Sequence, residues 1–102
     1  MAINDGKTDN EVLERTKLKE PELYKVVLHN DDYTTMEFVV EVIIEVFHKD
    51  TLSARRIMLD IHRKGSGSVG SYTYDVATTK AEQVHRRARE QEFPLRCSVE
   101  PA

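Results

Sequence analysis

The chain has 102 residues, 39% of them hydrophobic and 32% charged, so it is long enough for one compact domain with a modest core. Its net charge of −3 excludes a protein that binds polyanions through its overall charge, although a local basic face stays open. The single cysteine excludes a disulfide framework and fits a reducing cytosol. No apolar run approaches the roughly 20 residues of a membrane span, and we expect no secretory signal.

The first 21 residues are polar and end at Pro21. They contain too little apolar surface to offset the entropy lost on ordering them. We therefore expect a flexible tail at 1–21, followed by one folded domain at 22–102.

The first regular element predicted is a strand at Tyr24–His29, which is rich in β-branched and apolar residues. A capping box follows, in which Thr34 caps a helix and Glu37 reaches back, and the helix runs to about His48. Its predicted core stripe is Met36, Val39, Val40, Ile43 and Phe47.

A second helix is expected from the turn at Lys49–Asp50 to Lys64–Gly65. Residues 65–71, GSGSVGS, read as a flexible loop that leads into a strand at Val69–Tyr74. A second capping box at Thr79–Glu82 predicts a third helix to about Glu92, and a last strand is predicted at Leu95–Val99. The fold class is therefore α+β: a β-α-α-β-α-β sandwich whose small, mainly antiparallel three-stranded sheet has three helices on one face.

Three consecutive polar residues, Asn30, Asp31 and Asp32, stand where the first strand ends. The simpler interpretation is a turn that also caps the next helix. The alternative is a cation site, because carboxylates accept hydrogen bonds from an ammonium or bind a metal. The spaced acids and glycine of a calcium loop are missing, and no histidine pairing suits zinc, so we expect no metal and no cofactor.

His62 stands four residues after Met58 and shares a helix face with it, so a neutral His62 would accept a hydrogen bond beside the acids. Met36 and Met58 read either as core or as an adaptable pocket lining. The stretch KAEQVHRRARE (80–90) reads as a solvated face, a protein-docking face or a phosphate-binding face. No nucleophile–base signature or phosphate-binding glycine loop is present, so an enzyme is not expected.

Together these stretches resemble the ClpS family of bacterial adaptors. The resemblance rests on YKVVLHNDDYTTMEFVVEVI (24–43), ARRIMLDIH (54–62), the TK pair at 79–80 and EFPLRCSVE (92–100), and it covers roughly residues 21–101. Thr35 stands where relatives usually carry proline, Ile61 where valine is common, and GSGSVG where relatives have a more apolar segment.

The resemblance implies an adaptor of the bacterial cytoplasm that binds free N-terminal Leu, Phe, Tyr or Trp of N-degron substrates. It would deliver them to the N-domain of the ClpA unfoldase of the ClpAP protease, the N-end rule route. It implies that Asn30, Asp32 and His62, helped by Asp31, hold the α-amino group. The implied side-chain pocket consists of Leu28, Thr34, Met36, Val39, Met58, Ile61 and Leu95. The implied unfoldase-docking positions are Tyr33, Asp75 and Lys80. No contact with nucleic acid or membrane is expected, and the alternative is a small nucleic-acid-binding α+β domain that uses the helix at 80–92.

Overall fold

A computed structural model describes residues 21–102 of the chain. The tail predicted at 1–21 lies outside these residues except for Pro21. The elements are β1 (Tyr24–His29), α2 (Met36–Phe47), α3 (Thr51–Lys64), β2 (Ser66–Tyr72), α4 (Tyr74–Glu90) and β3 (Arg96–Pro101). This β-α-α-β-α-β order and the α+β class are the predicted ones.

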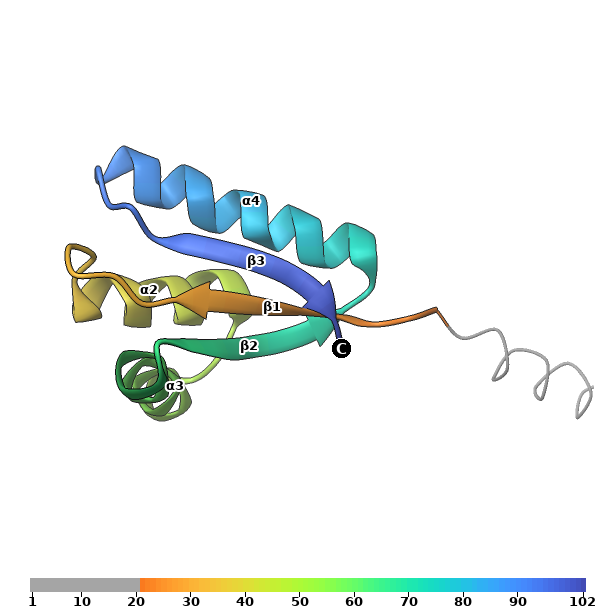
Figure 1. Ribbon diagram of the computed structural model, residues 1–102, viewed down its shortest axis with the longest axis horizontal. Coiled ribbons are helices and arrows are strands. Elements are labelled where there is room, and N and C mark those ends of the chain that lie inside the picture. The colour runs from red at the N-terminus through yellow and green to blue at the C-terminus, as the bar shows by residue number, and fades with distance from the viewer. Residues whose placement is uncertain (1–20) are drawn as a thin grey trace, which may run out of the picture.

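The sheet has the order β2-β1-β3, and both pairings are antiparallel. β1 therefore lies in the centre, which explains why its sequence is the most apolar of the three strands. Helices α2 and α4 contact the sheet and each other, and α3 packs against α2 and β2 (Figure 1). The core between these layers includes Val26 and Leu28 of β1, both fully buried.

Helix α2 begins one residue later than a Thr34 cap predicts. Its N-cap is Thr35, whose hydroxyl accepts a hydrogen bond from the Phe38 N–H at 3.1 Å. The Thr34 hydroxyl instead donates to Asp31 at 2.7 Å. The predicted cap was therefore wrong, and Thr34 belongs to the turn before the helix.

The core face of α2 also differs from the predicted stripe. Met36 is 45% exposed and Val40 is only half-buried. The helix is covered by the sheet on one side and by its neighbouring helices on others, so its buried set is wider than one stripe. The buried residues of α2 are Phe38, Val39, Val42, Ile43, Val46 and Phe47.

The predicted flexible loop at 65–71 was wrong, because every residue of Ser66–Tyr72 except Val69 pairs with β1. Pairing uses backbone groups, so small side chains do not prevent it. The register shifts between Val26 and Val27, and this bulge leaves Val69 without a partner in the pairing. Val69 is only 2% exposed and belongs to the core.

Helix α4 begins at Tyr74, five residues before the predicted Thr79 cap, which was wrong. The hydroxyl of Thr79 donates to the Asp75 carbonyl at 2.8 Å, so it bonds back inside the helix instead of capping its start. The helix ends at Glu90 rather than Glu92, which has a left-handed φ of 60°. The last strand starts at Arg96, one residue later than predicted.

Candidate functional site

The turn between β1 and α2 is organised by Asp31. One carboxylate oxygen accepts hydrogen bonds from the backbone N–H groups of Tyr33, at 2.8 Å, and Thr34, at 2.7 Å; the other accepts from the Thr34 hydroxyl. Burial raises the pKa of Asp31, but these hydrogen bonds outweigh it and leave the pKa below its usual value. Asp31 is therefore ionised at neutral pH, and both of its oxygens are already used within the turn.

The end of α3 is joined to this turn by the backbone. The Asn30 N–H donates to the Gly65 carbonyl at 2.9 Å, and the Gly65 N–H donates to the Ile61 carbonyl at 2.8 Å. Gly65 has a φ of 92°, a left-handed conformation that favours glycine at a helix C-cap. These bonds hold the last turn of α3, which carries His62, against the end of β1.

A cavity of about 230 Å³ lies at this junction, and we call it the degron pocket after the ligand that the family resemblance implies. Its polar lining consists of Asn30, Asp31, Asp32 and His62. Its remaining lining consists of Thr34, Met36, Val39, Met58 and Ile61. The structure thus brings together nine of the eleven residues named for ligand recognition, although they come from two separate segments, 30–39 and 58–62.

The other two predicted pocket residues do not line the cavity. Leu28 is fully buried and Leu95 is 4% exposed, and both belong to the core cluster. Within the wall, Ile61 and Val39 are buried, whereas Met36 is exposed. Ile61 and Val39 are therefore held in place by the core, while Met36 has room to change rotamer.

The residues Asn30, Asp31 and Asp32, which we call the acidic turn, do not form a metal site in the described part of the chain. Across residues 21–102, no group of three or more His, Cys, Asp or Glu side chains is placed to hold a metal ion. Asp32 is exposed, and none of its carboxylate oxygens is engaged in the turn bonds made by Asp31. With Asn30 and His62 also exposed, the polar side of the degron pocket offers hydrogen-bond acceptors to a ligand cation.

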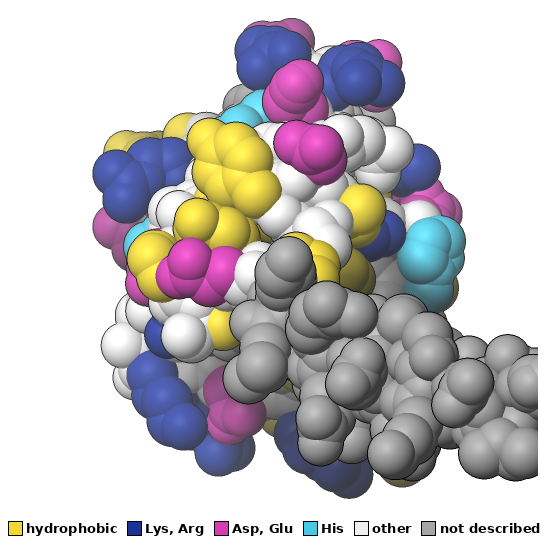
Figure 2. Space-filling view, turned by 90° about the vertical axis from the view of Figure 1, so that its right-hand side faces the viewer, with side chains coloured by type: hydrophobic (Ala, Val, Ile, Leu, Met, Phe, Trp, Pro, Cys, Tyr) yellow, Lys and Arg dark blue, Asp and Glu magenta, His cyan; other side chains and the backbone are white. Residues whose placement is uncertain are grey.

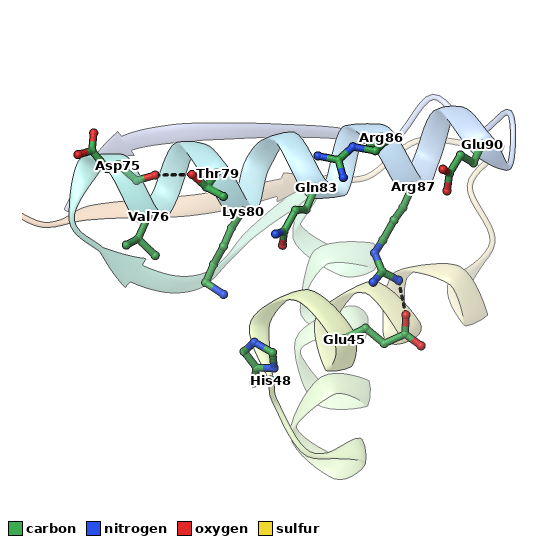
Figure 3. A pocket seen from close by; sticks show the side chains of 10 residues that line it. All are labelled: Glu45, His48, Asp75, Val76, Thr79, Lys80, Gln83, Arg86, Arg87 and Glu90. Carbon is green, nitrogen blue, oxygen red and sulfur yellow. Dashed lines mark hydrogen bonds and ion pairs between the residues drawn. The ribbon is translucent and has the colours of Figure 1, made fainter.

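A second and larger cavity, of about 840 Å³, lies between α4 and the end of α2, and we call it the α2–α4 groove (Figure 3). It is lined by Glu45, His48, Asp75, Val76, Thr79, Lys80, Gln83, Arg86, Arg87 and Glu90. Asp75 and Lys80, two predicted docking residues, are therefore neighbours on one surface. Tyr33 is 78% exposed and belongs to the turn between β1 and α2, and this turn lies at the opposite end of the sheet from the start of α4 (Figure 1).

Sequence reasoning named Asp75 and the stretch 80–90 as candidates for docking, but it missed the α2 side of this groove, Glu45 and His48. The α4 members recur at helical spacings, from Val76 through Thr79, Lys80 and Gln83 to Arg87, so the pattern was present in the sequence. The partner residues on α2 could not be paired with them before the helices were placed side by side.

The charges of the α2–α4 groove are mixed in sign. Glu45, Asp75 and Glu90 stand among its bases, and Arg87 forms an ion pair with Glu45 (Figure 3). A phosphate backbone is bound by a continuous basic surface. The arrangement does not favour the nucleic-acid alternative for the helix at 80–92.

Hydrophobic side chains are exposed at the end of the molecule where α4 begins, among acidic and basic ones (Figure 2). Tyr74 is 57% exposed and Val76 is 43% exposed. The Tyr74 ring meets the Tyr24 ring edge to face, with 5.1 Å between centroids. This end adjoins Asp75, so apolar and charged groups suitable for a protein partner lie together. No helix among the described residues is long and apolar enough to cross a bilayer.

Comparison with known proteins identifies a family. The model of the family described as "ATP-dependent Clp protease adaptor protein ClpS" matches residues 19–98. A ClpS adapter protein of Acetivibrio thermocellus is 60% identical over 83 residues, covering 81% of this chain and 84% of its own. A ClpS adapter protein of Burkholderia mallei is 55% identical over 104 residues, covering 100% of both chains.

One solved structure resembles the fold described above. It is that of Agrobacterium tumefaciens ClpS2 bound to L-phenylalaninamide, with a TM-score of 0.78 and 43% sequence identity. The match covers 81% of this chain and 100% of the other. Its ligand combines a free α-amino group with an aromatic side chain.

Proposed function

Because the chain belongs to the ClpS family of Clp protease adaptors, we propose that its degron pocket holds the N-terminal residue of a protease substrate. The protein is an adaptor rather than an enzyme, as its relatives are named. The ligand is a free N-terminus that begins with Leu, Phe, Tyr or Trp, the N-degron of the N-end rule. The observation that carries the proposal is one cavity lined both by hydrogen-bond acceptors and by apolar side chains.

The polar side suits an α-ammonium group. In this proposal Asn30, Asp32 and His62 accept its hydrogen bonds, and Asp31 adds negative charge while it holds the turn. Hydrogen bonds to charged groups contribute roughly 1.5–3 kcal/mol each. An acetylated N-terminus has lost the charge and most of the donors, so it makes few of these bonds.

The apolar side suits the first side chain. Burying an aromatic side chain of roughly 150–250 Å² at about 25 cal/mol per Å² contributes at most about 4–6 kcal/mol. Losses of translational, rotational and side-chain freedom remove at least several kcal/mol. The remainder, together with the ammonium bonds, is enough for a dissociation constant near the micromolar range or below.

Fluorescence anisotropy with a labelled peptide that begins with Phe tests the ligand. We expect binding by the free peptide, none by its N-acetylated form, and a large loss with Asp32→Ala or His62→Ala. Glu41→Ala, an exposed change on α2 outside the degron pocket, is the matched control and leaves binding intact. Equal affinity for the free and the acetylated peptide would reject the proposal.

Delivery requires contact with the unfoldase. We propose that the N-domain of ClpA docks on the start of α4, where Asp75 and Lys80 line the α2–α4 groove beside exposed apolar side chains. Tyr33 is assigned to docking by family resemblance alone, and in this fold it would make a separate contact. We place the activity in the bacterial cytoplasm, which fits the unpaired thiol of Cys97.

Docking is tested by charge reversal. Asp75→Lys is expected to weaken binding of the isolated ClpA N-domain while leaving the affinity for a Phe-initiated peptide unchanged. The matched control is Glu82→Lys, an exposed change on α4 that is not part of the groove lining. Loss of N-domain binding in both variants would show that only the overall charge matters.

A further inference from the structure

A third cavity opens directly beside the degron pocket, between α2 and α3, and we call it the α2–α3 groove. It has a volume of about 380 Å³ and is lined by Met36, Glu37, Val40, Arg55, Met58 and Leu59. Met36 and Met58 also line the degron pocket. The two cavities therefore share a wall made of two flexible thioether side chains.

The lining of the α2–α3 groove is mostly apolar and partly exposed. Met36 is 45% exposed and Leu59 is 40% exposed, while Val40 and Met58 are half-buried. Its two charged residues, Glu37 and Arg55, have opposite signs, and they form no ion pair within residues 21–102. Adjacent exposed apolar side chains rimmed by charge are typical of an interaction surface.

We propose that this groove receives the side chain of the third residue of the substrate, with a preference for apolar residues. The inference rests on the proposed function, because the first residue must occupy the degron pocket. The ammonium is then held beside Asn30, Asp32 and His62. The first peptide carbonyl oxygen carries a partial negative charge, so the carboxylates repel it, and the chain leaves over Met36 and Met58, which the degron pocket shares with the α2–α3 groove.

The spacing of an extended chain selects the third residue. Successive side chains of an extended peptide point to opposite sides, so the first and third point the same way. They lie about 6.6 Å apart along the chain. On α3, the degron pocket is lined by Ile61 and His62, and the α2–α3 groove is lined by Arg55 and Leu59. The groove therefore lies about one helical turn away, and one turn is about 5.4 Å. The two spacings agree, while the second side chain points to solvent.

Two labelled peptides test the proposal, one beginning Phe-Ser-Leu-Ser and the other Phe-Ser-Ser-Ser. With the wild-type protein, leucine at the third position is expected to tighten binding about fivefold, since its side chain is partly buried. Leu59→Ser is expected to abolish this difference. The matched control is Leu52→Ser, a change on the same helix at a residue that is 68% exposed and outside the groove, and it is expected to keep the difference.

L-phenylalaninamide has no third residue, so it separates the two proposals. We expect it to displace the labelled Phe-Ser-Ser-Ser peptide equally well from the wild-type protein and from Leu59→Ser. If it and both peptides fail to bind wild type, the proposed function is wrong. If the peptides bind but leucine at the third position does not tighten binding, the groove does not receive the third side chain. The same conclusion follows if the tighter binding survives both Leu59→Ser and a second variant, Val40→Thr.

A different path for the chain has its own signature. Another cavity, of about 370 Å³, borders the acidic turn on the side of His29 and Arg96. A chain leaving that way would prefer an acidic residue at the second or third position and would lose the preference with Arg96→Ser. That result would overturn the inference while leaving the ligand assignment intact.

Discussion

Gly67 of β2 lies against Ile61 of α3 so closely that a Cβ atom on residue 67 would be 2.9 Å from Ile61 Cγ1. Ile61 is only 2% exposed and forms part of the wall of the degron pocket. The contact point is a branch near the side chain's base rather than its flexible end. The absence of a side chain at position 67 therefore determines how near α3 approaches the sheet.

Gly67→Ala is expected to destabilise the fold by about 1–3 kcal/mol, the usual cost of overpacking a core. Because Ile61 must move, the affinity for a Phe-initiated peptide is expected to fall as well. Denaturant unfolding and anisotropy measure the two effects. Gly65→Ala meets nothing within 4 Å but is strained at a φ of 92°, so it is expected to lose stability through the backbone alone. Unchanged stability in Gly67→Ala would show that α3 moves away without cost.

Lys80 has a structural role in addition to the proposed docking role. Its ammonium donates to the Val46 carbonyl at 2.7 Å, near the C-terminal end of α2, and lies 5.2 Å from the Tyr72 ring centroid. Lys80→Met removes the hydrogen bond and the favourable charge at a helix C-terminus, so we expect a loss of about 1–2 kcal/mol. Thermal unfolding measures this loss. The matched control is Arg86→Met, an exposed change on the same helix. Equal stability of the two variants would show that Lys80 does not stabilise the fold.

Within the acidic turn, Asp31 is expected to stabilise the fold, and Asp32 is expected to bind the ligand. The folded-state pKa of Asp31 is below its ordinary value of 3.8, so its ionisation stabilises the fold above that pH. The contribution is lost as the pH falls below 3.8 through the folded-state pKa. The stability difference between wild type and Asp31→Asn is therefore expected to shrink between about pH 5 and pH 2. Unfolding midpoints across that range measure it.

Asp32→Asn is the matched change in the same turn, since Asp32 makes none of these internal bonds. It is expected to leave the stability of the fold nearly unchanged while weakening the binding of a Phe-initiated peptide. Interchanged results for the two variants would mean that the roles assigned to the two carboxylates are reversed.

Cys97 is expected to be chemically inert in the folded protein. Burial raises the pKa of its thiol to about 12, so almost no thiolate is present at neutral pH. Iodoacetamide at pH 7.5 is expected to leave the native protein unmodified and to label it once urea unfolds it, as mass spectrometry would record. Rapid labelling of the native protein would show that β3 opens readily.

The sequence by itself determined the element order, and it placed a polar cluster, Asn30–Asp32, at the end of the first strand. Strand β1 and helix α3 were predicted within a residue of their ends, because β-branched alternation, the polar turn at Lys49–Asp50 and the glycine at position 65 are local signals. The acidic turn was also visible locally, since Asp31 binds groups only two and three residues away.

The tertiary structure decided what depends on contacts between distant segments. The strand at Ser66–Tyr72 looks like a loop because its stability comes from backbone pairing with β1, not from its small side chains. Burial placed Leu28 and Leu95 in the core, whereas the other predicted pocket residues line the cavity. In the α2–α4 groove, Arg87 forms an ion pair with Glu45, which is 42 positions away in the sequence. The residue pattern of one helix cannot predict which residues of another helix will lie opposite it.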